Sequence, residues 1–165
     1  LIEKYNLKTG DRFLDLGCGK GFLLNDLLEE CPGLQVRGLE VSQYAIDNSH
    51  NGTASHVDFG SVEKLPYPDD YFDVVVGINV FHFPTPENAE KGFREMMRVG
   101  KKNARFFIQV DAFTNDVERE RLLAWAPIIK TVYSVDEWFA LFKKVNYGGD
   151  YFWTFVRPQT PEKFE

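Results

Sequence analysis

Three closely spaced glycines near the start of the chain could form a ligand-binding turn. Gly17, Gly19 and Gly21 follow a short apolar run that carries Asp15. Glycine adopts positive φ readily and allows a ligand to approach the backbone closely. The helix expected from position 21 presents unpaired N–H groups at its start, where a carboxylate or phosphate would fit. The pattern therefore predicts a strand, a ligand-binding turn and a helix.

The spacing of these glycines distinguishes between possible ligands. A dinucleotide fingerprint places its third glycine five positions after the first, but Phe22 occupies that position here and Gly21 comes one residue early. Asp15 would repel a pyrophosphate and attract an ammonium group. The amino-acid end of S-adenosylmethionine carries both an ammonium and a carboxylate. The loop thus favours that cofactor over a nicotinamide, and an NAD-dependent oxidoreductase becomes the weaker hypothesis.

Glu40 has the chemistry of a ribose-binding residue. It ends the second expected strand and follows Gly17 at the separation, roughly 20 residues, that is typical of such an acid. A carboxylate has two acceptor oxygens, so it could accept hydrogen bonds from both ribose hydroxyls. Val41 beside it could cover one face of the adenine.

Several segments together resemble the class I S-adenosylmethionine-dependent methyltransferases, in the branch that methylates small molecules. Residues 15–21 (DLGCGKG) resemble the first motif of that family, and residues 38–42 (GLEVS) the end of its second strand. Residues 65–75 (LPYPDDYFDVV) and 93–99 (FREMMRV) resemble segments before the fourth and fifth strands. The resemblance covers roughly residues 5–110 and implies S-adenosyl-L-methionine as donor. It implies these cofactor-binding residues: Asp15, Gly17, Cys18, Gly19, Gly21, Glu40, Val41, Ser61, Val62 and Asn79.

Two positions depart from the family pattern. Ser61 stands where an acidic residue often holds the adenine amino group, so its hydroxyl or the backbone of Val62 would have to substitute. Residues 100–103 (GKKN) replace the usual proline-glycine-glycine turn. We expect that turn to lie far from the cofactor.

Hydrophobic periodicity predicts the elements that position these residues. Strands are expected at 12–16, 35–40, 55–59, 72–78, 105–110 and 150–157, with helices at 21–30, from 42 to about 51, at 85–99, at 116–126 and from the capping box of Ser134 and Glu137. This alternation predicts a doubly wound α/β, mostly parallel Rossmann-like sheet with helices on both faces. We expect one domain over residues 1–165. Residues 111–133 interrupt the rhythm and are expected to form a lid or specificity insertion, and the tail from Pro158 is expected to be loose.

The strand ends also offer a candidate for catalysis. His82 follows the fourth expected strand and could act as a general base, because an imidazole titrates near neutrality. The alternative is that His82 only packs or forms hydrogen bonds under the cofactor. Asn79 and Asp111 supply too few ligands for a magnesium site, so no metal is expected. The transfer itself would be an in-line displacement whose acceptor atom, O, N or C, stays open.

Charge and composition restrict the partners. The net charge is −6, with a pI of about 5.1, which makes a nucleic acid an unfavourable partner. We see no apolar run of the ~20 residues that cross a bilayer and no secretory leader. We therefore expect a cytoplasmic monomer or homodimer that acts on a small-molecule acceptor without a membrane. Cys18 and Cys31 are expected to be packing residues. The alternative function is a catalytically silent, S-adenosylmethionine-binding regulatory subunit. Because the sequence starts at Leu1, it stays open whether further residues precede Leu1.

Overall fold

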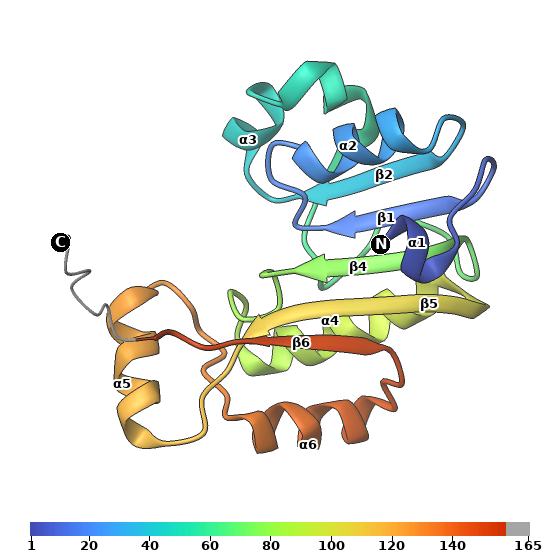
Figure 1. Cartoon of the computed structure of the whole chain (residues 1–165). Coiled ribbons are helices and arrows are strands. Elements are labelled where there is room, and N and C mark those ends of the chain that lie inside the picture. Colours follow the sequence, from blue (N-terminus) through green and yellow to red (C-terminus); the bar gives the residue numbers. More distant parts are fainter. Residues whose placement is uncertain (158–165) are drawn as a thin grey trace, which may run out of the picture.

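Six parallel strands form one sheet in the order β3-β2-β1-β4-β5-β6 (Figure 1). The structure is a computed structural model that describes residues 1–157. Every strand pairing in the sheet is parallel, so the predicted doubly wound arrangement is confirmed. The strands are β1 (Arg12–Leu16), β2 (Gln35–Glu40), β3 (Val57–Phe59), β4 (Phe72–Ile78), β5 (Gly100–Asp111) and β6 (Asp150–Thr154).

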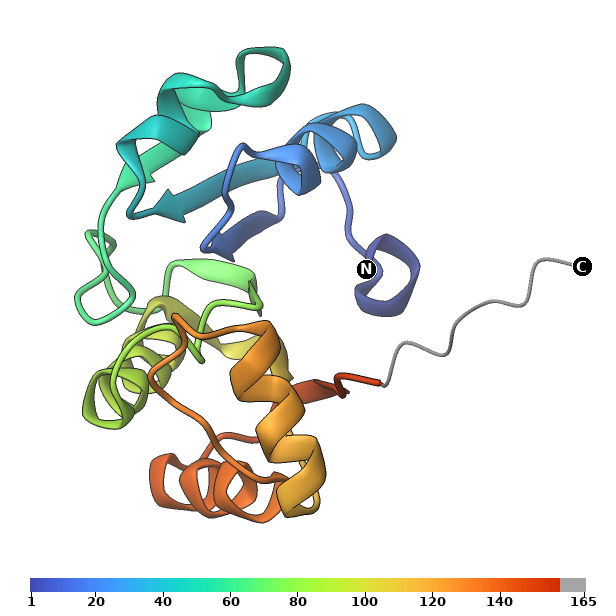
Figure 2. The same cartoon turned by 90° about the vertical axis from the view of Figure 1, so that its left-hand side faces the viewer.

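Helices cover both faces of the sheet because successive strand residues point to opposite sides. Phe13 of β1 packs in the same apolar cluster as α1 and α2, whereas its neighbour Leu14 packs with α4 and α6. Figures 1 and 2 show α2 on one side of the sheet and α4 and α6 on the other. The helices are α1 (Ile2–Tyr5), α2 (Phe22–Glu30), α3 (Gln43–Asp47), α4 (Pro86–Val99), α5 (Asp116–Trp125) and α6 (Val135–Val145).

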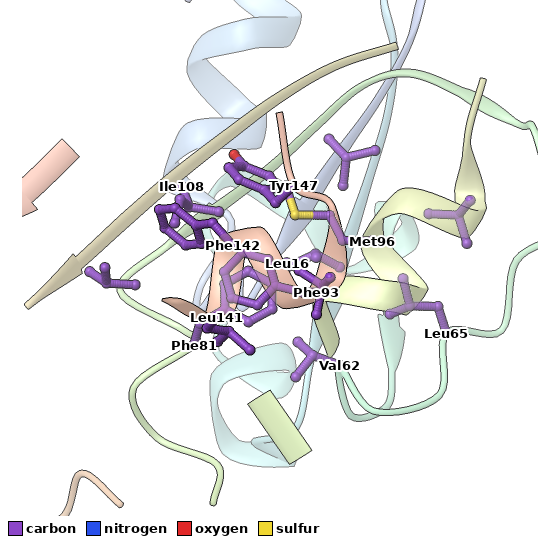
Figure 3. Packing of buried hydrophobic residues seen from close by; sticks show 14 of the residues in the cluster. Leu16, Val62, Leu65, Phe81, Phe93, Met96, Ile108, Leu141, Phe142 and Tyr147 are labelled. Carbon is purple, nitrogen blue, oxygen red and sulfur yellow. The ribbon is translucent and has the colours of Figure 1, made fainter. Parts of the chain in front are cut away.

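An aromatic core fixes the loop that follows β4. The fully buried rings of Phe81 and Phe93 stack with their centroids 4.3 Å apart (Figure 3). Trp138 of α6 is also fully buried, and its indole Nε1 donates a hydrogen bond to the carbonyl of Asp111 at 3.0 Å. A buried tryptophan needs such a partner for its N–H. The core therefore holds the ends of β4 and β5 in fixed positions.

The segment after β2 differs from the prediction. Ser42 caps α3 as expected, since its hydroxyl accepts a hydrogen bond from the backbone N–H of Ala45. The predicted helix to about residue 51 is wrong, because α3 ends at Asp47 and a 3₁₀ segment, η1 (His50–His56), follows. Asn51 and Gly52 have φ values of 45° and 75°. A continuous α-helix excludes this left-handed conformation, and β3 consequently begins at residue 57 rather than 55.

The start of β5 also differs. The predicted turn at residues 100–103 belongs to the strand, which begins at Gly100 and pairs there with Phe72. The register then shifts, so that Val74 pairs with Arg105. This irregularity lies at the amino end of β5. The capping box of Ser134 and Glu137 is confirmed at the start of α6, while the expected loose tail from Pro158 lies outside the described residues.

Candidate active site

The carboxyl ends of β1, β2, β3 and β4 surround a cavity of about 460 Å³. This volume is in the range of small-molecule sites. The cavity lies where the strand order reverses between β1 and β4, which is the position at which open α/β sheets bind ligands. Figure 2 looks onto this edge of the sheet. The lining residues are Gly17, Leu39, Glu40, Val41, Gly60, Ser61, Val62, Glu63, Asn79, Val80, Phe83, Pro84 and Lys130.

The glycine loop adopts the conformation that its sequence predicts. Gly17, Gly19 and Gly21 have φ values of 73°, 55° and 77°. A Cβ at Gly17 would lie 2.8 Å from Cγ2 of Val80, and one at Gly21 would overlap the hydroxyl of Thr53. A Cβ at Gly19 would meet no heavy atom within 4 Å. Two of the glycines are therefore required by close packing, while Gly19 is required by its φ alone and borders open space.

Glu40 holds the glycine loop through backbone hydrogen bonds. Its Oε2 accepts one from the N–H of Gly19 at 2.9 Å, and its Oε1 accepts two, from Val41 at 3.0 Å and Ser42 at 2.8 Å. A carboxylate offers about four acceptor positions. These contacts leave room for about one further donor. The predicted contact with both ribose hydroxyls would therefore require one of the backbone bonds to give way.

Asp15 lies beneath the loop as a buried acid. Its exposed fraction is 4%, and within residues 1–157 its side chain has no hydrogen-bond partner. Burial, and to a smaller extent the nearby negative charge of Glu40, together raise the pKa of its carboxyl to about 7. An ammonium group beside Asp15 would stabilise the ionised carboxylate. A positive charge close to this end of β1 would therefore be electrostatically favourable.

The predicted cofactor-binding residues fall into two groups. Gly17, Glu40, Val41, Ser61, Val62 and Asn79 line the cavity. The side chain of Val41 is 66% exposed, whereas that of Val62 is 7% exposed. Asp15, Cys18, Gly19 and Gly21 lie in or under the loop without lining the cavity. Cys18 packs against Gly38, and burial raises the pKa of its thiol to about 12, so it is a packing residue and not a nucleophile.

A family model described as a methyltransferase domain matches residues 14–108, more than half of the chain. The chain belongs to the class I S-adenosylmethionine-dependent methyltransferases. The match spans the end of β1 from Leu14, the glycine loop, Glu40 and the whole of β2, β3 and β4. It confirms the resemblance that the motifs indicate.

Similar proteins agree with this assignment. The uncharacterized methyltransferase C70.08c of Schizosaccharomyces pombe is 28% identical over 140 residues, which are 82% of this chain and 50% of that protein. The uncharacterized methyltransferase YcgJ of Bacillus subtilis is 28% identical over 157 residues, 86% of this chain and 59% of that one. The crystal structure of YcgJ has the same fold, with a TM-score of 0.70 at 23% identity, over 87% of this chain and 64% of that one. The chain thus spans about half of the length of these curated relatives.

His82 of this methyltransferase occupies a buried position. Its exposed fraction is 3%, and it is not among the residues that line the cavity. Its Nδ1 accepts a hydrogen bond from the backbone N–H of Asp111 at 3.4 Å and lies 3.5 Å from Oδ2 of the same residue. Burial lowers the pKa of the imidazole to about 4 and raises that of the Asp111 carboxyl. Both shifts favour the neutral forms of the two side chains.

Sequence reasoning missed Glu63 and Lys130, which both line the cavity of the methyltransferase. Glu63 is two residues from Ser61, so its position shortly after β3 could have marked it as a candidate site residue. Lys130 lies in the irregular segment between α5 and α6, and no motif marks it. Phe83 and Pro84 come from the loop after β4 and complete the apolar part of the wall.

In the described part of the chain, no three His, Cys, Asp or Glu side chains gather closely enough to hold a metal ion. Over the same residues, no helix combines the length and the apolar character needed to cross a bilayer.

Proposed function

We propose that this methyltransferase domain transfers the methyl group of S-adenosylmethionine to a small-molecule acceptor bound in the cavity. The observation that carries the proposal is the meeting of the glycine loop, Glu40 and the buried Asp15 at the switch point of the sheet. These groups suit a ligand that combines an ammonium, a ribose and an apolar ring. The cavity of about 460 Å³ is in the size range of small-molecule sites, and in this proposal the donor occupies part of it.

The donor-binding residues have separate roles in this proposal. Asp15 binds the ammonium, and Glu40 accepts a hydrogen bond from a ribose hydroxyl while it holds Gly19. Val41 and Val62 cover the adenine, with the Ser61 hydroxyl or the Val62 N–H at its edge. Gly17, Cys18, Gly19 and Gly21 shape the loop along which the amino-acid part lies, and Asn79 borders that part from the end of β4.

The protein contributes mainly by alignment. S-adenosylmethionine would supply a methyl group bonded to a sulfonium sulfur. A nucleophile of the acceptor would attack the methyl carbon in line with the C–S bond, and the sulfur would leave as a neutral thioether. Holding reacting groups in this geometry can lower a barrier by ~7–11 kcal/mol. Val80, Phe83 and Pro84 line the cavity, and in this proposal they form the apolar wall beside the acceptor.

Residues 111–133 form the acceptor-specificity segment in this proposal. They comprise the end of β5, α5 and the chain that leads toward α6, and Figure 2 shows this chain passing the loop after β4. The relatives include proteins named as sterol 24-C-methyltransferases from Gibberella zeae, which act on a small molecule. The proposal includes a cytoplasmic monomer or homodimer. The net charge of −6 disfavours binding to nucleic acid or to an anionic membrane surface.

His82 supports the specificity segment rather than acting as a base in this account. Its backbone carbonyl accepts hydrogen bonds from the N–H groups of Lys130 and Thr131, both at 3.0 Å. Its imidazole is buried against Asp111 and has a lowered pKa, so it is poorly suited to take a proton from an acceptor. We infer that His82 is a positioning residue.

Methyl transfer from labelled S-adenosylmethionine to a metabolite library tests the proposal. The wild-type chain is expected to label at least one small acceptor, and Gly19→Val to label none. If the chain binds S-adenosylhomocysteine but labels no acceptor, the silent regulatory subunit becomes the better account. If it binds neither form of the cofactor, both accounts are wrong.

A further inference from the structure

Lys130 is directed to the cavity by the residues on either side of it. Ile129 and Thr131 are 7% and 1% exposed, whereas Lys130 between them is exposed and lines the cavity. The chain bends at Lys130, and this exposed residue lines the cavity between two buried neighbours. Ile129 packs with Phe113 and Leu122 under α5. Burial of its two neighbours therefore sends the side chain of Lys130 away from the core.

The backbone around Lys130 is fixed to the wall of the cavity. The N–H groups of Lys130 and Thr131 both donate to the carbonyl of His82, and the Thr131 hydroxyl donates to the carbonyl of Pro84 at 2.8 Å. Three hydrogen bonds thus join this segment to the loop after β4. A residue on an irregular segment is ordinarily mobile, but these bonds place Lys130 reproducibly at the cavity.

The charge of Lys130 has no partner within the described residues. Lys101 and Lys144 form ion pairs with Asp73 and Glu90, both at 2.7 Å. No carboxylate of residues 1–157 lies within salt-bridge distance of Lys130. It is also the one cation among the described residues that line the cavity. In a chain of net charge −6, an unpaired lysine at such a place is available for a ligand.

The surroundings of Lys130 indicate what kind of ligand would fit. Val80, Phe83 and Pro84 line the cavity and belong to the loop after β4, to which the Lys130 segment is hydrogen-bonded. The side chain of Phe83 is 42% exposed. Apolar walls bind an apolar body, while an ammonium beside them binds an anion through charge-assisted hydrogen bonds.

We infer that the methyl acceptor is an amphipathic carboxylate, with an apolar or aromatic body, and that Lys130 binds its carboxylate. The inference rests on the proposed function, because it assigns the acceptor half of the same cavity. The competing source of a carboxylate is the amino-acid end of the cofactor itself. The two sources differ in whether Lys130 affects cofactor affinity or only acceptor affinity.

Paired probes that differ only in charge test the inference. Phenylacetate and phenylacetamide, and octanoate and octanamide, are titrated at millimolar concentration into the S-adenosylhomocysteine-saturated protein. Wild type is expected to bind each carboxylate about tenfold more tightly than its amide, a difference of about 1.4 kcal/mol. In Lys130→Met the ratio is expected to fall to about one. Lys102→Met, which removes an exposed lysine at the amino end of β5, is expected to leave it unchanged.

The outcomes separate this inference from the proposed function. If wild type binds S-adenosylhomocysteine but binds acid and amide equally, or binds neither carboxylate, the inference is overturned and the proposed function is not. A tenfold loss of S-adenosylhomocysteine affinity in Lys130→Met also overturns it, because Lys130 would then bind the carboxylate of the cofactor. If wild type fails to bind S-adenosylhomocysteine at all, the proposed function itself is wrong. Melting temperatures of the three proteins check that each is folded.

Discussion

Oε2 of Glu40 accepts a hydrogen bond from the backbone N–H of Gly19 at 2.9 Å, across the gap between β2 and the glycine loop. The same carboxylate accepts hydrogen bonds from the backbone N–H groups of Val41 and Ser42. One side chain therefore fixes both the turn after β1 and the turn after β2. We conclude that Glu40 orders the donor site before any ligand contact, in addition to the ribose contact proposed for it.

Replacing Glu40 tests this double role. Glu40→Ala leaves three backbone N–H groups without their acceptor, so the free energy of unfolding is expected to fall by about 1–3 kcal/mol. The thermal shift caused by S-adenosylhomocysteine is expected to disappear. Glu40→Gln keeps one amide oxygen and is expected to be intermediate in both measurements. A normal ligand shift in Glu40→Ala would contradict the role of this carboxylate.

Gly19 and Gly10 form a matched pair for testing the loop. Both have positive φ, 55° and 89°, and a Cβ at either would meet no atom within 4 Å. Valine at either position is expected to cost about 1–3 kcal/mol of stability through backbone strain. Only Gly19→Val is expected to abolish S-adenosylhomocysteine binding, because Gly10 precedes β1 at the opposite edge of the sheet. Equal ligand affinities of the two variants, measured by calorimetry, would show that the loop does not contact the ligand.

Asp15 is expected to make ligand affinity depend on pH. Its folded-state pKa of about 7 is above the ordinary 3.8, so protonation of this carboxyl favours folding. Its contribution to stability is complete below about pH 4 and is lost as the pH rises through about 7. Ligand ammonium binding requires the ionised form, so affinity for S-adenosylhomocysteine is expected to rise between pH 5.5 and 7.5, by up to about tenfold per pH unit.

Asp15→Asn is the control for this pH dependence. The variant is expected to bind the ligand weakly and with a flat pH profile, and to gain stability relative to wild type as the pH rises toward 8. Titrations in two buffers of different ionisation enthalpy would detect the proton that wild type releases at pH 6. A pH-independent affinity in wild type would remove Asp15 from the ammonium site.

His82 is expected to act through structure. Its folded-state pKa of about 4 lies below the ordinary 6.5, so its contribution to stability is lost as the pH falls from about 6.5 to about 4. His82→Asn is expected to lower the free energy of unfolding by about 1–3 kcal/mol at pH 7, and this deficit is expected to shrink toward pH 4. Denaturant titrations over this range provide the measurement.

Kinetics distinguish this role from that of a base. A general base contributes typically 10²–10⁴-fold to the rate, which His82→Asn would remove from kcat. A positioning residue is expected instead to raise KM for the acceptor, with kcat changed by less than about tenfold. An inflection of kcat near pH 6.5 that vanishes in the variant would contradict the positioning role.

The sequence predicted the elements best where local pattern and tertiary structure agree. The bounds of β2 and β4 matched because both are short runs limited by clear turn residues. The helix after Ser42 was overextended because Asn51 and Gly52 adopt left-handed conformations that no periodicity reveals. The start of β5 was missed because the register shift opposite Phe72 depends on pairing with β4.

The same division holds for the site. Residues at the strand ends or directly after them, such as Glu40 and Val41, were predictable because parallel strands bring their carboxyl ends to one edge. Lys130 was not, since its position depends on hydrogen bonds to His82 and Pro84, far away in the sequence. The burial of His82 likewise depends on the path of residues 126–133, which carry no regular structure.

Calorimetric titration of S-adenosylhomocysteine into the wild-type chain, beside a parallel titration of NADH, tests the central claim most directly. We expect saturable binding of S-adenosylhomocysteine at one site per chain and no saturable binding of NADH. Absence of S-adenosylhomocysteine binding by a folded chain, or saturation by NADH alone at micromolar concentration, would contradict the assignment of this cavity to a methyl donor.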